Sequence, residues 1–173
     1  MADETRVVEA GDWPQAVAAA RGEGYAFFDW LSAVDRTDDA AAPGFDVVCH
    51  LYDVSAPGRL RGILLSTRVA DGEALPSLTA VFAGAAWHER ETHEMFGIGF
   101  DGFDDGSGLG LRPLLLPDGF EGTPLRKSFQ LAARASKPWP GGKEPGEGHE
   151  SVRSPSRRRV QAAGVPPPEW GPR

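Results

Sequence analysis

The amino-acid sequence predicts an α+β fold: a mainly antiparallel β-sheet with helices packed on one face, followed by an extended C-terminal tail rich in Pro and Gly. Three observations predict it. Two strand-like segments, 45–54 and 60–69, are joined by a four-residue turn, as in a β-hairpin. Helix-like segments stand before and after this pair, without the regular alternation of an α/β fold. From residue 133 onward, Pro and Gly replace the aliphatic residues that a packed core requires.

The first helix is predicted near the N-terminus. Asp12 or Trp13 is suited to its cap, and Pro14 is suited to its first turn because a proline there loses no helical hydrogen bond. Gly22 and Gly24 are expected to end it. The segment that follows, Tyr-Ala-Phe-Phe-Asp-Trp-Leu-Ser-Ala-Val, is apolar and aromatic, and its pattern alone fits either a helix or a strand.

A loop and a hairpin come next. Residues 35–44 are acidic, rich in Ala and interrupted by a proline, which predicts a loop. In the first hairpin strand Phe45, Val47, Cys49 and Leu51 share one face, and the alternate residues are also largely apolar. A strand that is apolar on both faces is expected at the centre of a sheet. The second hairpin strand alternates apolar residues with Arg and Ser, so we expect it to be half-exposed.

The segment from Trp87 to Phe129 carries the functional prediction. Pro76 is expected to open a short helix over 77–82. A longer helix is predicted over 87–96, because Glu, Arg and Met favour helix and no Gly or Pro interrupts the run, and Gly97 is placed to end it.

A helical wheel of this longer helix shows a conflict. Trp87 and Met95 define one apolar stripe, but Glu91 and Glu94 fall on the same face. A buried carboxylate costs several kcal/mol unless it is paired, so this face requires cations. Phe96 points away from the stripe. The helix is therefore expected to need cover on two sides, from its own domain and from a partner protein.

Cations for this face are available in the same segment. Arg90 can reach Glu94 at a spacing of four residues. Beyond the turn in Gly-Thr-Pro-Leu-Arg-Lys, two cations are expected to return to the glutamates or to an acidic patch of the partner, and the alternative is a solvated basic pair. The residues predicted to form a subunit interface are Glu89, Arg90, Glu91, Glu94, Phe96, Arg112, Arg126 and Lys127.

Three ordered blocks of this segment resemble a known family. The runs E-R-E-T-H-E-M-F-G-I-G-F-D-G, L-R-P-L-L and G-F-E-G-T-P-L-R-K-S-F are similar to the thirty-kilodalton subunit of respiratory complex I, which is the C-type subunit of the bacterial NADH:quinone oxidoreductase. The resemblance favours a strand over 28–34. The sequence departs from the family pattern at Phe103, Pro113 and Thr123, where the family has His, Arg and His.

The resemblance implies a cofactor-free structural subunit of the peripheral arm, on the cytoplasmic side of the plasma membrane. The complex would use NADH, FMN, iron–sulfur clusters and quinone, none of them bound by this chain. The implied partners are the forty-nine-kilodalton-type subunit (the D-type subunit), which helps to form the quinone site, and the adjacent iron–sulfur subunits. The alternative is the equivalent subunit of a related membrane-bound hydrogenase or dehydrogenase complex. A free-standing soluble enzyme is the third and least favoured interpretation.

Composition and motifs exclude several functions. The net charge of the 173 residues is −7, which disfavours nucleic-acid binding. No apolar run approaches the ~20 residues that span a bilayer, and the N-terminal Met-Ala-Asp-Glu-Thr-Arg lacks the apolar core of a signal peptide, so we expect membrane contact only through partners. His88 and His93 are five residues apart, whereas two zinc ligands on one helical face need a spacing of four. The lone Cys49 is interpreted as a core residue in a reducing compartment. No phosphate-binding glycine motif occurs.

Three regions are predicted. Residues 1–86 form the α+β domain, 87–132 form the family-signature helix and an extended strap, and 133–173 form a tail that is disordered or extended over a partner. The tail is basic, and Trp139 and Trp170 are its candidate anchors. Three successive arginines, 157–159, are too few to predict nucleic-acid or lipid binding.

Overall fold

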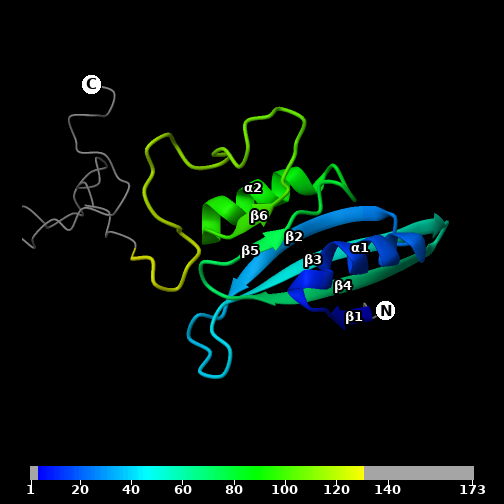
Figure 1. The fold of residues 1–173 in the computed structure, drawn as a ribbon. Coiled ribbons are helices and arrows are strands. Elements are labelled where there is room, and N and C mark those ends of the chain that lie inside the picture. Colours follow the sequence, from blue (N-terminus) through cyan, green and yellow to red (C-terminus); the bar gives the residue numbers. More distant parts are fainter. Residues whose placement is uncertain (1–3, 131–173) are drawn as a thin grey trace, which may run out of the picture. The chain divides into compact units, whose positions relative to one another are not determined.

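The computed structural model describes residues 4–130 (Figure 1). The chain divides into two compact units, and the first, Met1–Asp118 with Thr123–Phe129, holds every helix and strand of the described residues. The predictions for the tail and its anchors lie outside the described residues. None of the described helices has the length and hydropathy needed to span a bilayer.

A four-stranded sheet forms the centre of this unit, in the order β1-β4-β3-β2. The strands are β1 (Glu4–Val7), β2 (Phe27–Asp35), β3 (Phe45–Ala56) and β4 (Arg59–Val69). Strands β2, β3 and β4 are antiparallel neighbours, and β1 joins β4 in parallel. The predicted hairpin and the central position of its first strand are confirmed, but the strands reach Ala56 and start again at Arg59, so the turn is shorter than the predicted four residues. The ambiguous aromatic segment is strand β2.

Sequence reasoning missed β1. The strand has only four residues, Glu-Thr-Arg-Val, which are mostly polar and largely exposed. Neither propensity nor alternation therefore marks this segment as a strand. The strand depends on pairing with β4, for example Arg6 opposite Leu65. Tertiary pairing of this kind cannot be seen in a local window of sequence.

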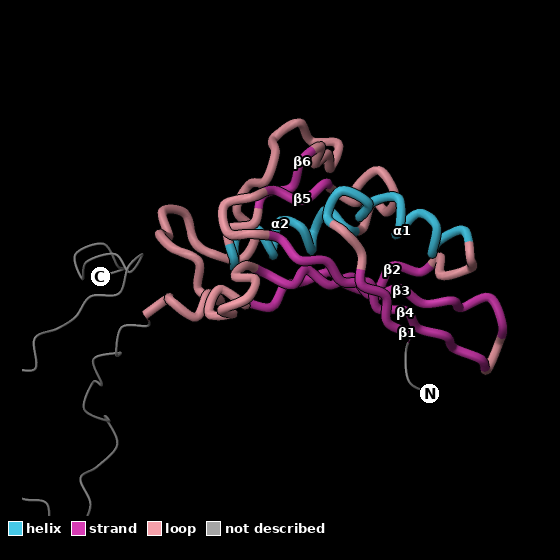
Figure 2. The backbone as a smooth tube through the Cα atoms, turned by 60° about the horizontal axis from the view of Figure 1, so that its bottom comes forward, coloured by secondary structure: helices cyan, strands magenta, loops and turns pink. Residues whose placement is uncertain are grey.

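Two α-helices lie on the same side of the sheet (Figure 2). Helix α1 (Trp13–Gly22) follows a short 3₁₀ turn, η1 (Ala10–Asp12), and has its proline in the first turn as predicted. Helix α2 (Ala85–Phe96) ends at Gly97, which adopts the left-handed conformation with φ 77°. Its N–H donates to His93 O at 2.7 Å, which completes the expected C-cap.

The helix predicted over 77–82 is wrong. A small two-stranded parallel sheet is formed there by β5 (Ala74–Pro76) and β6 (Gly99–Asp101), and only turns separate β5 from α2. Ser77 N–H donates to Asp101 O at 2.8 Å, which continues this pairing. The proline therefore ends a strand instead of opening a helix.

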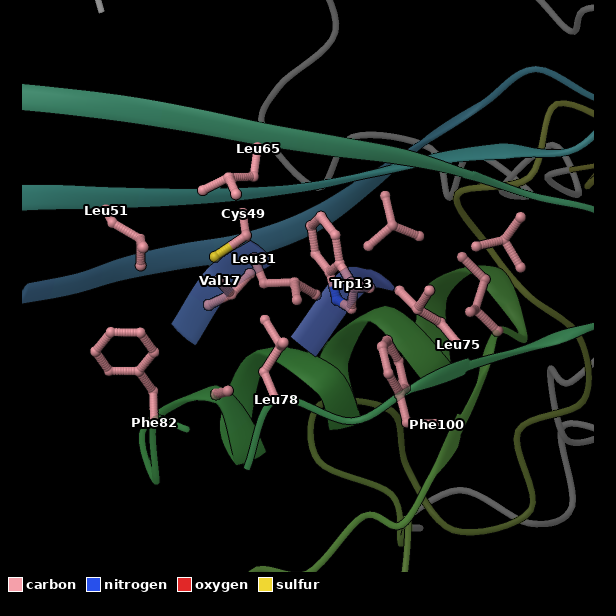
Figure 3. Packing of buried hydrophobic residues seen from close by; sticks show 14 of the residues in the cluster. Trp13, Val17, Leu31, Cys49, Leu51, Leu65, Leu75, Leu78, Phe82 and Phe100 are labelled. Atoms are coloured by element: carbon pink, nitrogen blue, oxygen red, sulfur yellow. The ribbon is translucent and has the colours of Figure 1, made fainter. Parts of the chain in front are cut away.

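The core lies between the helices and the sheet (Figure 3). Trp13 and Val17 of α1 meet the inner face of the sheet, where Cys49 and Leu65 are fully buried. Met95 and Phe96 of α2 belong to the same cluster. The interpretation of Cys49 as a core residue is confirmed, and burial raises the pKa of its thiol.

Candidate subunit interface

Helix α2 distributes its charged residues over several sides. Glu89 is fully buried, whereas Glu91 is exposed. The predicted apolar stripe is wrong in one member: Met95 is 9% exposed but Trp87 is 63% exposed. The face that meets the core instead follows the spacing Ala85, Glu89, Thr92 and Phe96. Sequence reasoning missed this spacing because it includes Glu89, and a carboxylate is not expected among core residues.

Glu89 is satisfied without any cation. Ser77 Oγ donates to its Oε2 and Leu78 N–H donates to its Oε1, both at 2.6 Å. Burial raises the pKa of Glu89 to about 7, and these two hydrogen bonds only partly oppose the rise. The expected ion pair with a distal Arg or Lys is not formed in the described residues. The buried carboxyl group holds the turn that precedes α2 in place.

Arg90 contacts the extended segment 112–116. Its Nε donates to Arg112 O at 3.1 Å, and its Nη2 donates to Pro113 O at 2.7 Å. The guanidinium also lies 5.5 Å from the centre of the Trp87 ring, which is a cation–π contact. Arg90 is only 7% exposed, so the protein largely encloses this charge.

Glu94 binds the same segment four residues later on α2. Its carboxylate accepts hydrogen bonds from the N–H groups of Leu114 at 3.1 Å, Leu115 at 2.7 Å and Leu116 at 2.8 Å. The predicted Arg90–Glu94 ion pair is wrong for the described chain. These two side chains instead bind the backbone of five successive residues, because carbonyls and amides of an irregular segment need partners of both signs.

Arg112 turns toward its own loop. Its Nη1 lies 2.5 Å from Asp105 Oδ2 and 3.0 Å from Ser107 Oγ. Hydrogen bonds from Ser107 and then Arg112 hold the pKa of the Asp105 carboxyl well below its usual range. This cation therefore orders the glycine-rich loop before the extended segment and does not reach the glutamates of α2.

The second pair of predicted cations also binds aspartates of its own chain. Arg126 Nε donates to Phe96 O at 2.5 Å, and its Nη2 lies 2.9 Å from Asp71 Oδ1. Lys127 Nζ lies 2.6 Å from Asp38 Oδ1. The return to the glutamates is wrong, and the pair is not simply solvated. Contact of these residues with a partner stays a prediction.

A backbone contact completes this second attachment. Lys127 N–H donates at 2.7 Å to Asp35 Oδ2, in a carboxyl group that also accepts from Thr37. Leu125 N–H donates to Met95 O at 3.1 Å. Residues 123–129 therefore join the end of α2 to the loops that follow β2 and β4, and we call them the C-terminal clasp.

Phe96 does not present a second face to a partner. Its side chain is 5% exposed and meets Phe45 edge to face, with ring centroids 6.1 Å apart. The expectation that a partner must cover Phe96 is wrong, because the domain itself covers it. Among the predicted interface residues on α2, Glu91 is the exposed one.

The departures from the family pattern have defined surroundings. Phe103 is partly buried against the core. The Pro113 carbonyl accepts a hydrogen bond from Arg90, a contact that needs no N–H from the proline. Thr123 lies in the clasp, with its Cγ2 close to Gly97.

Two exposed apolar residues of this region were missed. Trp87 and Leu115 are 63% and 60% exposed, and both lie beside the contacts of Arg90 and Glu94. A signal for Leu115 existed in the run Leu-Leu-Leu between two prolines. Successive side chains of an extended segment point to opposite sides, so three leucines in a row are all buried only if both sides of the segment are covered.

Comparisons with known proteins identify a family. The sequence model of the family described as "Respiratory-chain NADH dehydrogenase, 30 Kd subunit" matches residues 6–135. The C-type subunit of the NADH-quinone oxidoreductase of Chlorobium phaeobacteroides is 32% identical over 126 residues, which are 72% of each chain. A C-type subunit of the same enzyme from Rhizobium meliloti is 37% identical over 118 residues, which are 68% of this chain and 60% of that one.

Longer relatives and solved structures were also found. The C/D-type subunit of the NADH-quinone oxidoreductase of Klebsiella pneumoniae is 33% identical over 135 residues, 78% of this chain but 19% of the relative. The trypsin-resistant fragment of Nqo5 has a similar fold, with a TM-score of 0.51 at 23% identity over 58% of this chain and 80% of that one. A chain of the membrane-bound sulfane sulfur reductase, an archaeal respiratory membrane complex, has a TM-score of 0.61 at 21% identity. The similarity covers 76% of this chain and 74% of that one.

The family match spans most of the sequence and includes α2, the extended segment and the clasp. In these elements the signature residues Arg90, Glu94 and Arg126 form hydrogen bonds within the chain. The chain therefore belongs to the family of the 30 Kd subunit of the respiratory-chain NADH dehydrogenase.

Proposed function

We propose that this chain is a cofactor-free structural subunit of the peripheral arm of a proton-translocating NADH:quinone oxidoreductase. It supports the subunit that helps to form the quinone site while electrons pass from NADH to quinone through FMN and iron–sulfur clusters held by other chains. We place it at the cytoplasmic side of the plasma membrane, attached through its partners.

One observation carries this proposal: the charged signature residues of α2 bind their own chain. Glu89 holds a turn, while Arg90 and Glu94 hold the backbone of segment 112–116. These bonds give the three side chains a structural role, because they fix the path of the backbone that they bind. The signature thus builds a shaped surface, and such a surface is what a supporting subunit provides.

The relatives support a D-type subunit as the main partner. In the C/D-type protein of Klebsiella pneumoniae, the matching region is a small part of one longer chain, and its name joins C with D. Fusion of two chains keeps both at a high local concentration, which favours partners that act together. We propose that the chain described here binds the D-type subunit and the adjacent iron–sulfur subunits.

Affinity purification of the full chain from its own cells tests the proposal. We expect a D-type subunit and a flavoprotein that oxidises NADH to co-purify, and NADH:quinone activity to disappear when the chain is removed. Recovery of a solitary chain with an activity of its own would overturn the proposal.

A second candidate is the equivalent subunit of a membrane-bound complex with another substrate. The fold also occurs in a complex named a sulfane sulfur reductase, so this fold is not restricted to NADH oxidation. Co-purification with a nickel-containing subunit, in place of the NADH-oxidising flavoprotein, would favour this candidate.

A further inference from the structure

We propose that the D-type subunit binds a patch made by Trp87, Glu91, Pro113 and Leu115, which we call the α2 docking patch. The inference rests on the proposed function and assigns the contact to a surface of this chain. Trp87 and Leu115 are 63% and 60% exposed, and Glu91 and Pro113 are exposed as well.

Arg90 and Glu94 join the two segments that carry the patch. Arg90 packs against the Trp87 ring at 5.5 Å and donates to Pro113 O at 2.7 Å. Glu94 lies three residues after Glu91 and accepts from Leu115 N–H at 2.7 Å. Helix α2 and the extended segment are therefore joined both near Trp87 and at Leu115.

The same contacts restrain the Trp87 ring and the backbone at Leu115. The buried guanidinium of Arg90 supports the indole, and three backbone hydrogen bonds to Glu94 fix the path of the chain at Leu115. A side chain that is already ordered loses little entropy on binding. Tryptophan is one of the residue types that contribute most to the energy of interfaces.

Charge indicates the chemistry of the partner surface. Arg90 Nε and Nη2 are occupied by backbone carbonyls, so that cation faces inward. Glu91 enters no ion pair in the described part of the chain. The patch thus offers two large apolar side chains and one carboxylate. A complementary surface is an apolar pocket with a Lys or Arg at its rim, and we assign this surface to the D-type subunit.

The test measures the Kd of the full-length chain for the D-type subunit of the same organism. We expect Trp87→Ala to weaken binding at least about thirtyfold, as for a central anchor, and Leu115→Ala to weaken it about tenfold. Glu91→Gln should lower the association rate and its dependence on salt. Val54→Ala and Leu60→Ala are matched controls, because these residues are 57% and 52% exposed on the β3–β4 hairpin. They should leave the Kd unchanged.

Thermal unfolding of each variant alone separates binding from folding. Trp87→Ala should keep the melting temperature of the wild-type chain within a few degrees. The inference is overturned if Trp87→Ala and Leu115→Ala bind like the wild-type chain, or if the hairpin controls lose as much affinity. It is also overturned if these substitutions change self-association or release another segment of the same chain instead of the D-type subunit. Failure of the wild-type chain to bind the D-type subunit would instead overturn the proposed function.

Discussion

Leu115 and Glu94 are joined by a short hydrogen bond, 2.7 Å from the Leu115 N–H to Glu94 Oε2, although 21 residues separate them in the chain. Two further N–H groups, from Leu114 and Leu116, converge on the other carboxylate oxygen. This convergence makes Glu94 a local organiser of the extended segment.

Glu94→Gln tests this role. A glutamine has one carbonyl oxygen, and its NH₂ group would face a backbone N–H, so at least one donor loses its acceptor. We expect the free energy of unfolding to fall by about 2 kcal/mol, as for a lost charge-assisted hydrogen bond. Urea unfolding measures the change. Glu91→Gln, on the exposed side of the same helix, should change it by less than about 0.5 kcal/mol. Equal losses in both variants would contradict the assignment.

Glu89 should make stability depend on pH. Its pKa is raised from 4.5 to about 7 in the folded chain, so the folded state holds a proton that the unfolded state has already lost. The contribution is complete below about pH 4.5 and is lost as the pH rises to about 7, a change of about 3 kcal/mol. Glu89→Gln should match the wild-type chain near pH 5 and exceed its stability near pH 8. Parallel stability curves for the two proteins would refute this behaviour.

Gly97→Ala should be destabilising. The residue has φ 77°, and a Cβ there would lie 3.1 Å from Arg126 Nη2 and 3.2 Å from Thr123 Cγ2. Strain and crowding together are expected to cost about 1–2 kcal/mol. Gly22→Ala, at the end of α1, has ordinary backbone geometry and nothing within 4 Å of the added carbon. It should be neutral or stabilise the protein slightly, and thermal unfolding distinguishes the two results.

Arg126→Met should loosen the C-terminal clasp. The substitution removes the hydrogen bond to Phe96 O, the ion pair with Asp71 and the contact with the Phe45 ring at 4.9 Å. We expect faster hydrogen exchange at Leu125 N–H and a loss of about 1–3 kcal/mol.

Lys127→Met is the matched control for the clasp. It removes only an exposed ion pair with Asp38 and keeps the Lys127 N–H bond to Asp35. Exposed pairs contribute little, so exchange at Leu125 should stay close to that of the wild-type chain. If Lys127→Met accelerates exchange as much as Arg126→Met, the clasp does not depend on the contacts of the Arg126 guanidinium.

The parts of the fold that the sequence predicted well have local signals. The hairpin is marked by two apolar strands around a short turn, and the end of α2 is marked by Gly97. Strand β1 and the β5–β6 pair have no such signal, since each is short and exists through a partner distant in sequence. Hydrophobic periodicity is a weak signal for such short elements, because it needs a longer window of sequence.

Contact among the signature blocks was predicted, but the groups that form it were not. The sequence indicated that α2 contacts the two later blocks, and hydrogen bonds of Arg90 and Arg126 confirm this contact. It suggested side-chain ion pairs, because opposite charges at suitable spacing are visible in a sequence. Backbone N–H and C=O groups are common to nearly all residue types. The residue types in the sequence therefore do not reveal that Arg90 and Glu94 bind segment 112–116. Burial of Glu89 was missed for the same reason, since its donors include the Leu78 N–H.

The use of backbone groups also bears on how this surface can change. Helix α2 binds two carbonyls and three N–H groups of segment 112–116, and every residue type has a carbonyl. Proline is accepted at position 113 because its missing N–H is not among the groups bound. Outward side chains can therefore be exchanged over generations while the path of the segment is preserved, so partner preference can drift without loss of the fold.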